Sequence, residues 1–251
     1  MSIKIICLNI WRGELLDNAL TFLLAEQPDI LMLQEVTNGQ DPSLPKRYRL
    51  VETLQSQLGE EYSYHFAPTL MNDCRAGKIE EGNAVFSRLP IVTQHTVFFS
   101  GVYGDYVDRP ENYALCPRSL QHVMLAAGAV PLHVINFHGI WDIDGKNPSL
   151  ARQKMVEAVM AETGERGHYV IGGDTNATAD NPAMQPLEKN FHTVFGNTRI
   201  TGFNMRRKTN PAYGYVVVDM LYTSPDIKIV SSASPDIDVS DHLPMILEIE
   251  V

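Results

Sequence analysis

Residues 132–141 have the sequence LHVINFHGIW and closely parallel residues 3–11, IKIICLNIW, near the start of the chain. Each stretch is a run of apolar residues that closes on a polar side chain and a tryptophan. Apolar runs of this length, rich in β-branched residues, predict buried β-strands. The likeness between the two stretches indicates two similar halves in the fold.

A helix and a second strand are predicted after each of these strands. In the first half, apolar residues at helical spacing indicate the helix, and PDILMLQEV at residues 28–36 begins the strand. In the second half, Asn147 and Pro148 suit the N-cap and first turn of a helix, and HYVIGGDTN follows at residues 168–176. The apolar positions of the two helices are Leu16, Leu20, Leu23 and Leu24, and Ala151, Met155, Ala158 and Val159.

The rest of the chain is predicted to be mostly β-structure. Residues 69–82 and 100–117 are expected to be surface loops that wall a substrate site. Short runs of alternating or β-branched residues, separated by Pro, Gly and Asn turn signals, are residues 81–88, 91–99, 119–127, 215–224, 227–233 and 244–251. This pattern favours an α/β (α+β) fold in which two packed sheets are flanked by helices.

Length and composition favour a single domain spanning residues 1–251. Of the 251 residues, 44% are hydrophobic, which is enough to bury a large core. No Pro-, Gly- or Ser-rich linker divides the chain, and no run of about 18 apolar residues predicts a transmembrane segment. The opening sequence MSIKIICLNIW resembles a first core strand and lacks the pattern of a signal peptide.

Cysteine usage and charge narrow the class of protein further. Cys7, Cys74 and Cys116 are widely spaced and form no CxxC pattern, which argues against a disulfide framework and predicts a cytoplasmic protein. The formal net charge of −10 repels polyanions on average. One short basic cluster, RRK at residues 206–208, fits a solvated loop better than a phosphate-binding site.

Polar side chains close the apolar runs of both halves. Asn9 ends the first run and Glu35 the second, while His138 ends the third. Asp174, with Asn176 two residues later, follows the fourth run. A residue in this position lies where a buried strand emerges toward solvent, so all of them can converge on one rim of two facing sheets.

Several of these side chains offer oxygen donors for a hard divalent cation. Glu35 and Asp241 supply carboxylate oxygens. Further oxygens are available from Asn9, Asp174 and Asn176. This donor set favours Mg²⁺, with Mn²⁺ as a possible substitute, over zinc.

Two histidines are suited to proton exchange beside such a cation. His138 closes a predicted strand, and His242 belongs to the terminal sequence SDHLP at residues 240–244. The imidazole pKa lies near neutral pH, so either side chain is a candidate proton acceptor or donor. Asp219 is a candidate to fix the tautomer of one of them and raise its pKa.

Each residue alone also has a structural interpretation. An Asp or Asn after a strand is most often a turn former or a helix cap, and a histidine beside an apolar run is most often a satisfied core residue. The complete set, in one order along the chain, favours function. The remaining histidines are expected to be structural or surface residues, and they are His65, His95, His122, His133, His168 and His192.

Arginine and tryptophan residues near the predicted site have less specific interpretations. For Arg118 and Arg152, a salt bridge to a neighbouring carboxylate is favoured over contact with a substrate phosphate. Trp11 and Trp141 follow equivalent strand ends and are expected to pack in the core or at its rim.

Seven segments in order resemble the endonuclease/exonuclease/phosphatase superfamily, which includes deoxyribonuclease I, apurinic/apyrimidinic endonucleases, neutral sphingomyelinases and inositol polyphosphate 5-phosphatases. They are CLNIW (7–11), LMLQEV (31–36), EGNAVFSRLP (81–90), INFH (135–138), IGGDTNA (171–177), VDMLY (218–222) and SDHLP (240–244). The resemblance spans Ile3 to Pro244. It implies a four-layered α/β sandwich with two face-to-face mixed β-sheets, flanking helices and a pseudo-twofold internal repeat.

The resemblance implies roles for the oxygen donors. Glu35 is expected to be the principal Mg²⁺ ligand, with Asn9 and Asp241 in or next to its shell. Asp174 and Asn176 resemble the pair that positions the attacking water and contacts the scissile phosphate or a second metal. Between these two residues, Thr175 replaces the usual aromatic of the turn, a change expected to alter packing more than chemistry.

The resemblance also implies roles for the histidines and their partners. His242 resembles the catalytic histidine of the terminal motif, and Asp219 the aspartate that pairs with it. His138 resembles the second histidine, with Glu81 as its candidate carboxylate partner. Glu81 and Arg118 are therefore expected at the substrate or just behind the catalytic groups.

The reaction implied by the resemblance is metal-assisted hydrolysis of a phosphoester through in-line attack of water. The acidic chain favours a phosphodiesterase or phosphatase acting on a small or lipid-like phosphoester. A DNA or RNA nuclease of the same superfamily is the alternative, with nucleic acid as the partner. A catalytically inactive binding or scaffold module is a third, less favoured interpretation.

Overall fold

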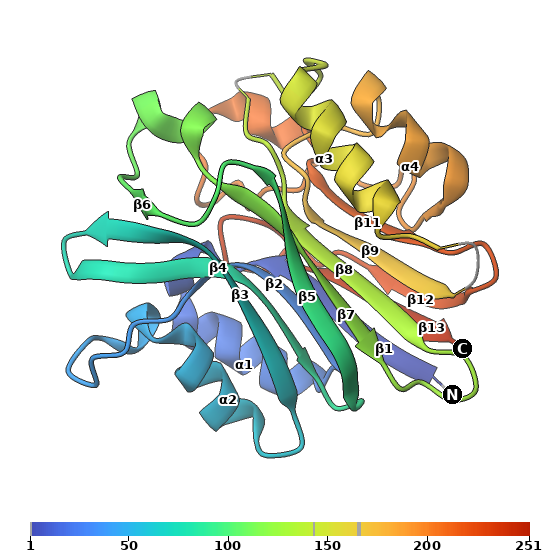
Figure 1. Ribbon diagram of the computed structural model, residues 1–251, viewed down its shortest axis with the longest axis horizontal. Helices are drawn as coiled ribbons and strands as arrows, with labels where there is room; N and C mark the ends of the chain where they lie inside the picture. Colours follow the sequence, from blue (N-terminus) through green and yellow to red (C-terminus); the bar gives the residue numbers. More distant parts are fainter. Residues whose placement is uncertain (1, 143, 165–166) are drawn as a thin grey trace.

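Two β-sheets pack face to face in the computed structural model, which describes residues 2–142, 144–164 and 167–251. Seven strands form one sheet in the order β12-β13-β1-β2-β4-β3-β6, and six form the other in the order β10-β11-β9-β8-β7-β5. Helices α1 and α2 lie on the outer side of the first sheet, and α3 and α4 on the outer side of the second (Figure 1). The predicted four-layered α/β sandwich is confirmed.

The bounds of the elements are as follows. The seven-stranded sheet contains β1 (Ser2–Asn9), β2 (Ile30–Thr37), β3 (Ser63–Cys74), β4 (Gly77–Ser87), β6 (Asp105–Tyr106), β12 (Lys228–Ala233) and β13 (Met245–Glu250). The six-stranded sheet contains β5 (Ile91–Ser100), β7 (Arg118–Leu125), β8 (Leu132–His138), β9 (His168–Asp174), β10 (His192–Thr193) and β11 (Asp219–Thr223). The helices are α1 (Leu16–Glu26), α2 (Leu50–Leu58), α3 (Leu150–Ala161) and α4 (Gln185–Asn190), with 3₁₀ turns at Trp11–Gly13, Lys46–Tyr48, Pro110–Leu115, Pro182–Met184 and Pro211–Tyr215.

The repeated strand, helix and strand unit is present in both sheets. Strand β1 runs parallel to β2, with Asn9 opposite Gln34, and β8 runs parallel to β9, with His138 opposite Asp174. Parallel strands joined by a helix end at the same edge of their sheet. The carboxyl ends of both pairs therefore carry the polar residues that the sequence places there.

The interior between the sheets changes from apolar to polar along the strands. Near the middle, Met32 and Val85 of one sheet pack with Val134 and Val170 of the other, all fully buried. Removing this apolar surface from water is the main stabilising term of the sandwich. Toward the polar strand ends, amides replace the hydrocarbon core.

One such amide pair connects the sheets directly. Gln34 of β2 donates from Nε2 to Oδ1 of Asn136 on β8 at 2.7 Å. Asn136 in turn donates from Nδ2 to the carbonyls of Leu33 at 3.0 Å and Ala84 at 3.2 Å. Both side chains are fully buried, so these bonds replace those that the amides make with water. They fix how the two sheets are registered beside the polar end.

The predicted loop at residues 69–82 is instead a β-hairpin. Strands β3 and β4 pair from Ser63 opposite Ser87 to Cys74 opposite Gly77, with a register shift between Pro68 and Leu70. The sequence prediction was wrong here because Asn72 and Glu81 are buried on this hairpin opposite Ile79 and Leu70, which interrupts the apolar pattern of a strand. Residues 100–117 contain the short strand β6 and a 3₁₀ turn in addition to loop.

Helix α3 begins later than its sequence indicates. Ser149, and not Asn147, is the N-cap, and its Oγ accepts from the backbone N–H of Arg152 at 3.2 Å. The carbonyl of Asn147 instead accepts from the Arg152 guanidinium. The N-cap is set by this tertiary contact, since either residue type suits the position.

Arg152 is fully buried and holds carbonyl groups of the surrounding loops. Its NH1 donates to the carbonyls of Asp144 and Asn147, each at 2.7 Å, and its NH2 donates to the carbonyl of Asn176. Among the residues that the structure describes, this arginine forms no salt bridge, contrary to the interpretation favoured from the sequence. It anchors the turn that contains Asn176 against the start of α3.

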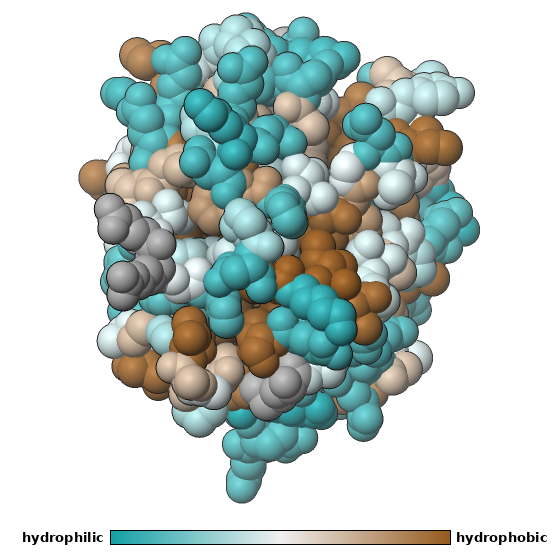
Figure 2. Space-filling model, turned by 90° about the vertical axis from the view of Figure 1, so that its right-hand side faces the viewer, coloured by the Kyte–Doolittle hydropathy of each residue, from teal (hydrophilic) through white to brown (hydrophobic). Residues whose placement is uncertain are grey.

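Figure 2 shows the side of the molecule on which the two chain ends lie, covered mostly by hydrophilic residues with hydrophobic ones gathered near the middle. The ends meet because β1 and β13 pair, with Ser2 opposite Glu250. Within the described residues, no helix is both long enough and apolar enough to cross a membrane.

Replacing Arg152 with methionine should lower the free energy of unfolding by about 3 kcal/mol. Hydrogen bonds to charged groups contribute roughly 1.5–3 kcal/mol each, and the substitution leaves buried carbonyl groups unpaired. Urea unfolding measures the change. Lys154→Met, at an exposed position of the same helix, is the matched control and should change little. Equal stability of both variants would contradict an anchoring role for Arg152.

Candidate active site

Backbone irregularities at the strand ends turn the polar side chains toward one another. Glu35 has φ 56° and lies where the pairing of β2 with β4 shifts register between Leu33 and Val36. On β9, Gly173 has φ 142°, and a Cβ there would lie 2.0 Å from the carbonyl oxygen of Phe137. This contact requires glycine directly before Asp174.

The amide of Asn9 connects carboxylates from both sheets. Its Nδ2 donates to Oε1 of Glu35 at 3.2 Å and to Oδ2 of Asp174 at 3.1 Å. Its Oδ1 accepts from the backbone N–H of Trp11 at 3.0 Å, which sets the orientation of the amide. In this orientation Asn9 presents hydrogen-bond donors, and not its oxygen, to the two carboxylates.

Both predicted histidines face the same oxygen of Asp174. His138 Nε2 lies 3.4 Å from Asp174 Oδ2, and His242 Nε2 lies 3.7 Å from it. Asp174 itself is almost fully buried, and its Oδ1 accepts from the backbone N–H of Asn176 at 3.0 Å. The sequence places these residues far apart, and the fold gathers them around one carboxylate.

His242 and Asp219 form the predicted pair. His242 Nδ1 lies 2.8 Å from Asp219 Oδ1. Gly202 leaves the space for this carboxylate, because a Cβ at that position would lie 2.3 Å from Asp219 Oδ2. Phe203 follows, with its ring centroid 4.8 Å from that of His242. The imidazole is therefore held at one nitrogen, while the other faces Asp174.

The two histidines differ in charge. Burial lowers the pKa of His242, but the carboxylates of Asp219 and Asp174 outweigh it and raise that pKa to about 10. Because this is above the ordinary 6.5, protonated His242 stabilises the fold fully below pH 6.5, and the contribution is lost as pH rises through about 10. Burial, with the positive charges of Arg118 and His242, lowers the pKa of His138 well below its ordinary value.

Glu35 and Asp174 lie in an environment that disfavours negative charge. Burial raises the pKa of both carboxyl groups. The charges of Glu81 and Asp241 raise the pKa of Glu35 further, although Arg12 acts in the opposite direction. A divalent cation between these groups would relieve the repulsion.

Glu81 pairs with an arginine and not with His138 as expected. Its Oε2 accepts from Arg12 Nε at 2.7 Å and from Asn72 Nδ2 at 3.0 Å. Arg12 also contacts Asp108, and its Nε lies 3.9 Å from Glu35 Oε2. A buried carboxylate needs a positive partner. The Arg12 guanidinium, which lies between Glu81 and Glu35, is that partner for Glu81.

Asp241 is held at the same rim because its neighbour Ser240 contacts Asn9, the last residue of β1. Ser240 Oγ donates to the carbonyl of Asn9 at 2.6 Å, and the Asp241 carbonyl accepts from the N–H of Asn204 at 2.9 Å. The carboxylate of Asp241 accepts from Lys208 Nζ. Asp241 thus lies beside the Asn9 network with a lysine as its counter-charge.

Arg118 contributes charge without the expected salt bridge. Its positive charge reaches His138 and lowers the pKa of that imidazole. Within residues 2–142, 144–164 and 167–251, no carboxylate lies within ion-pair distance of its guanidinium. Arg118 begins β7 and is half-buried.

The donor set fits a hard divalent cation. Glu35, Asp174 and Asp241 are carboxylates at one rim, and oxygen ligands of this kind are those that Mg²⁺ and Mn²⁺ prefer. The ligand atoms of Asp174, Asp219 and His242 also lie within 4.8 Å of one another. Since Asp219 Oδ1 and His242 Nδ1 are already paired with each other, the oxygen-rich rim near Glu35 is the better candidate metal site.

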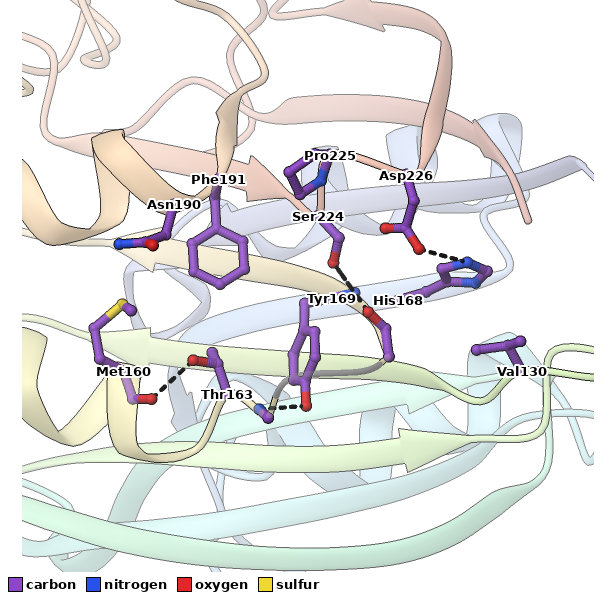
Figure 3. A pocket seen from close by; sticks show the side chains of 12 residues that line it. Val130, Met160, Thr163, His168, Tyr169, Asn190, Phe191, Ser224, Pro225 and Asp226 are labelled. Carbon is purple, nitrogen blue, oxygen red and sulfur yellow. Dashed lines mark hydrogen bonds and ion pairs between the residues drawn. The ribbon is translucent and has the colours of Figure 1, made fainter.

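A pocket of about 220 Å³ opens beside this rim, and its lining includes Trp11, Arg12, Tyr48, Asn72 and Glu81. A larger pocket, of about 550 Å³, is lined by Tyr169, Phe191 and Asp226 among others. Figure 3 shows this larger pocket, in which His168 points toward Asp226. It lies at the opposite end of β9 from Asp174, roughly 20 Å away at 3.3 Å per residue.

Comparison with known proteins identifies the family. The model of the Endonuclease/Exonuclease/phosphatase family matches residues 6–242. The protein belongs to this family, whose members are phosphoester hydrolases and are typically metal-dependent. A search of curated protein sequences gave no significant match.

Solved structures share the fold at low sequence identity. An endonuclease/exonuclease/phosphatase from Beutenbergia cavernae has a TM-score of 0.77 at 16% identity, over 100% of this chain and 72% of that one. TDP2 from D. rerio, complexed with single strand DNA product, has a TM-score of 0.71 at 17% identity, over 100% and 99%. A mannosyl-6-phosphatase from Bacteroides thetaiotaomicron has a TM-score of 0.70 at 14% identity, over 99% and 100%.

Residues not singled out from the sequence complete the site. Arg12 lies between Glu35 and Glu81, and Asn72 supports Glu81 from the unpredicted hairpin. Lys208 was assigned to a solvated cluster, yet its ammonium contacts Asp241. The one local sequence feature that could have pointed to Arg12 is its position three residues after Asn9.

Replacing Asp219 with asparagine should lower the pKa of His242 in the metal-free protein from about 10 toward the ordinary 6.5. The burial that disfavours the imidazolium would then act against less negative charge. An NMR pH titration of the imidazole measures the shift. Asp105→Asn, which changes an exposed carboxylate paired with Lys78, should leave His242 unaffected. If the pKa stayed near 10 without Asp219, another group would have to charge the imidazole.

Proposed function

We propose that this protein is a Mg²⁺-dependent hydrolase of small phosphoesters. One observation supports this above all: Asp174 Oδ2 lies 3.1 Å from Asn9 Nδ2, 3.4 Å from His138 Nε2 and 3.7 Å from His242 Nε2. The same Asn9 amide contacts Glu35. Two imidazoles thus converge on one carboxylate oxygen, and a metal-type carboxylate shares its amide donor, so the groups that phosphoester hydrolysis needs lie together.

In this proposal each histidine acts in a different charge state. His242, charged by Asp219, donates a proton from Nε2 in a hydrogen bond to a phosphoryl oxygen and stabilises the negative charge that develops there. His138 stays neutral and hydrogen-bonds a second oxygen. Asp174, with its raised pKa, accepts the proton of the attacking water, and Asn176 orients that water. We expect these charge states of His242, His138 and Asp174 to favour in-line attack of water at phosphorus.

Glu35 and Asp241 would hold the cation, with Asn9 orienting Glu35. When bound there, Mg²⁺ supplies neutralisation of charge on the phosphoryl and leaving oxygens, and Mn²⁺ can replace it. Arg12 pairs more closely with Glu81, at 2.7 Å, than with Glu35, at 3.9 Å, so Glu35 is the better placed of the two to bind the cation. Arg118 is placed to meet a substrate oxygen, because its charge faces His138.

Charge pairing favours a small or lipid-like phosphoester over nucleic acid. The net charge is −10, and each member of the single basic cluster already faces an acid: Arg206 pairs with Asp236, Arg207 with Asp238 and Lys208 with Asp241. These cations are therefore not free to neutralise a phosphate backbone. The structural likeness to a mannosyl-6-phosphatase agrees with this choice.

A nuclease is the second candidate function, favoured by the structural likeness to TDP2 complexed with single strand DNA product. A catalytically inactive binding module is less favoured, since each expected donor residue is present at the rim. We keep the cytoplasm as the predicted location, on the evidence of the unpaired cysteines alone.

Glu35→Gln and His242→Ala should each lower the turnover of a phosphoester in Mg²⁺ buffer by at least roughly 100-fold. The first removes the charge that binds the cation and the second removes the hydrogen-bond donor to the phosphoryl oxygen, and such groups contribute about 10²–10⁴-fold to rates. His192→Ala, at an exposed strand position outside the site, is the control. Unchanged turnover in both site variants would reject the hydrolase.

Substrate class should appear in a panel tested at low and high salt with Mg²⁺. We expect a sugar phosphate or a small phosphodiester to be hydrolysed faster than plasmid or abasic DNA, with weak salt dependence, because the basic side chains are already paired. Initial rates measured on both kinds of substrate provide the comparison. Faster cleavage of DNA that falls steeply with added salt would instead support the nuclease.

A further inference from the structure

A second group of ligand-type side chains lies away from the candidate active site. His95 on β5 is paired in register with His122 on β7, and His133 follows on β8. All three side chains lie on the face that α3 covers, since Leu120 and Ile135 of the same strands pack there with Met155 of the helix. Glu162 directly follows the last residue of α3. We call His95, His122, His133 and Glu162 the outer histidine cluster.

The ligand atoms of this cluster converge on one carboxylate oxygen. His95 Nε2 lies 2.6 Å from Glu162 Oε2, and His122 Nδ1 lies 2.8 Å from the same oxygen. All three ligand atoms are within 4.8 Å of one another. They come from two neighbouring strands and the end of a helix that are distant in sequence, so the fold itself brings them together.

A supporting set of rings fixes the orientation of His122. Its Nε2 lies 2.9 Å from His133 Nδ1, and the ring of His133 stacks on Tyr169 with centroids 4.7 Å apart. In this contact His133 Nδ1 can accept a hydrogen bond from the N–H of His122 Nε2, which leaves the lone pair of His122 Nδ1 available to an ion beside Glu162. Metal-binding histidines are usually held in this way at their second nitrogen.

Exposure leaves room for an ion and for a water ligand. The side chain of His95 is 50% exposed and that of Glu162 is 19% exposed, whereas His122 is 11% exposed. Ligands at about 2.0–2.2 Å in tetrahedral geometry are roughly 3.3 Å apart, so the present contacts of 2.6 and 2.8 Å must open by about 0.5–0.7 Å. His95 and Glu162 are the members free to move, because solvent lies on their outer side.

We propose that the outer histidine cluster is a binding site for a divalent transition-metal ion of the Zn²⁺ class, separate from the hydrolytic centre. His95 Nε2, His122 Nδ1 and Glu162 Oε2 are the protein ligands, and water completes a tetrahedral shell. Two imidazoles and one carboxylate suit Zn²⁺ better than Mg²⁺, which prefers oxygen ligands alone. The bound ion clamps the end of α3 to β5 and β7.

The alternative is a hydrogen-bond network in which Glu162 accepts from His95 and His122 without any ion. Nitrogen-15 spectra of the imidazole rings separate the two directly, using the full-length protein stripped of metal and titrated with ZnCl₂. We expect ligation shifts at His95 Nε2 and His122 Nδ1, and none at those atoms with MgCl₂. If the resonances of both nitrogens stay in place at saturating Zn²⁺, the proposal is overturned.

Variants provide an independent measure that does not use hydrolysis. Zn²⁺ affinity at the cluster, measured with a competing chelator in the Glu35→Gln background, should fall at least roughly tenfold in His95→Ala and in Glu162→Gln, because each loses a ligand. His192→Ala, with an exposed histidine on the same sheet, should keep the full affinity. Zn²⁺ should also raise the melting temperature of Glu35→Gln but not of its combination with His95→Ala. Equal Zn²⁺ affinities in His95→Ala, Glu162→Gln and the control His192→Ala would contradict the proposed site.

Discussion

One amide group determines how the candidate active site is assembled. The Nδ2 of Asn9 donates to Glu35 on its own sheet and to Asp174 on the other, so it ties two buried carboxylates across the sandwich. Two carboxylates in a buried setting repel each other, and burial raises the pKa of both. The amide, oriented by the N–H of Trp11, offsets part of this repulsion. The carboxylate rim therefore depends on the sheets being packed in this register, which the buried Gln34 and Asn136 also secure.

On the two sides of the Asn9 amide, the charged side chains of the rim are paired differently. On one side Arg12 pairs with Glu81 and approaches Glu35. On the other, Asp219 charges His242, while His138 faces positive neighbours and stays neutral. Unlike charge states in two similar imidazoles place a cationic and a neutral hydrogen-bond donor side by side in one site. The family's chemistry of phosphoester hydrolysis is consistent with such a division.

Much of the fold was predictable because it rests on local patterns. Apolar runs with polar ends located β1, β2, β8 and β9, and helical spacing located α1, which begins at Leu16. The second half of β4 was predicted at residues 81–88, but β3 and the hairpin tip were missed, because buried Asn72 and Glu81 interrupt the hydrophobic alternation there. The start of α3 was misplaced by two residues, since Arg152 and not local capping preference decides which residue caps it.

The sequence by itself determined the family, the layered fold and the identity of the polar residues that close the strands, because these are properties of short segments and their order. Only the tertiary structure decided which of those residues face one another. In the structure Glu81 pairs with Arg12 instead of His138, and Lys208 pairs with Asp241. His95, His122 and Glu162 lie together on the outer face of a sheet. Pairing between side chains distant in sequence depends on sheet register and on the burial of each charge, and neither is encoded in any one segment.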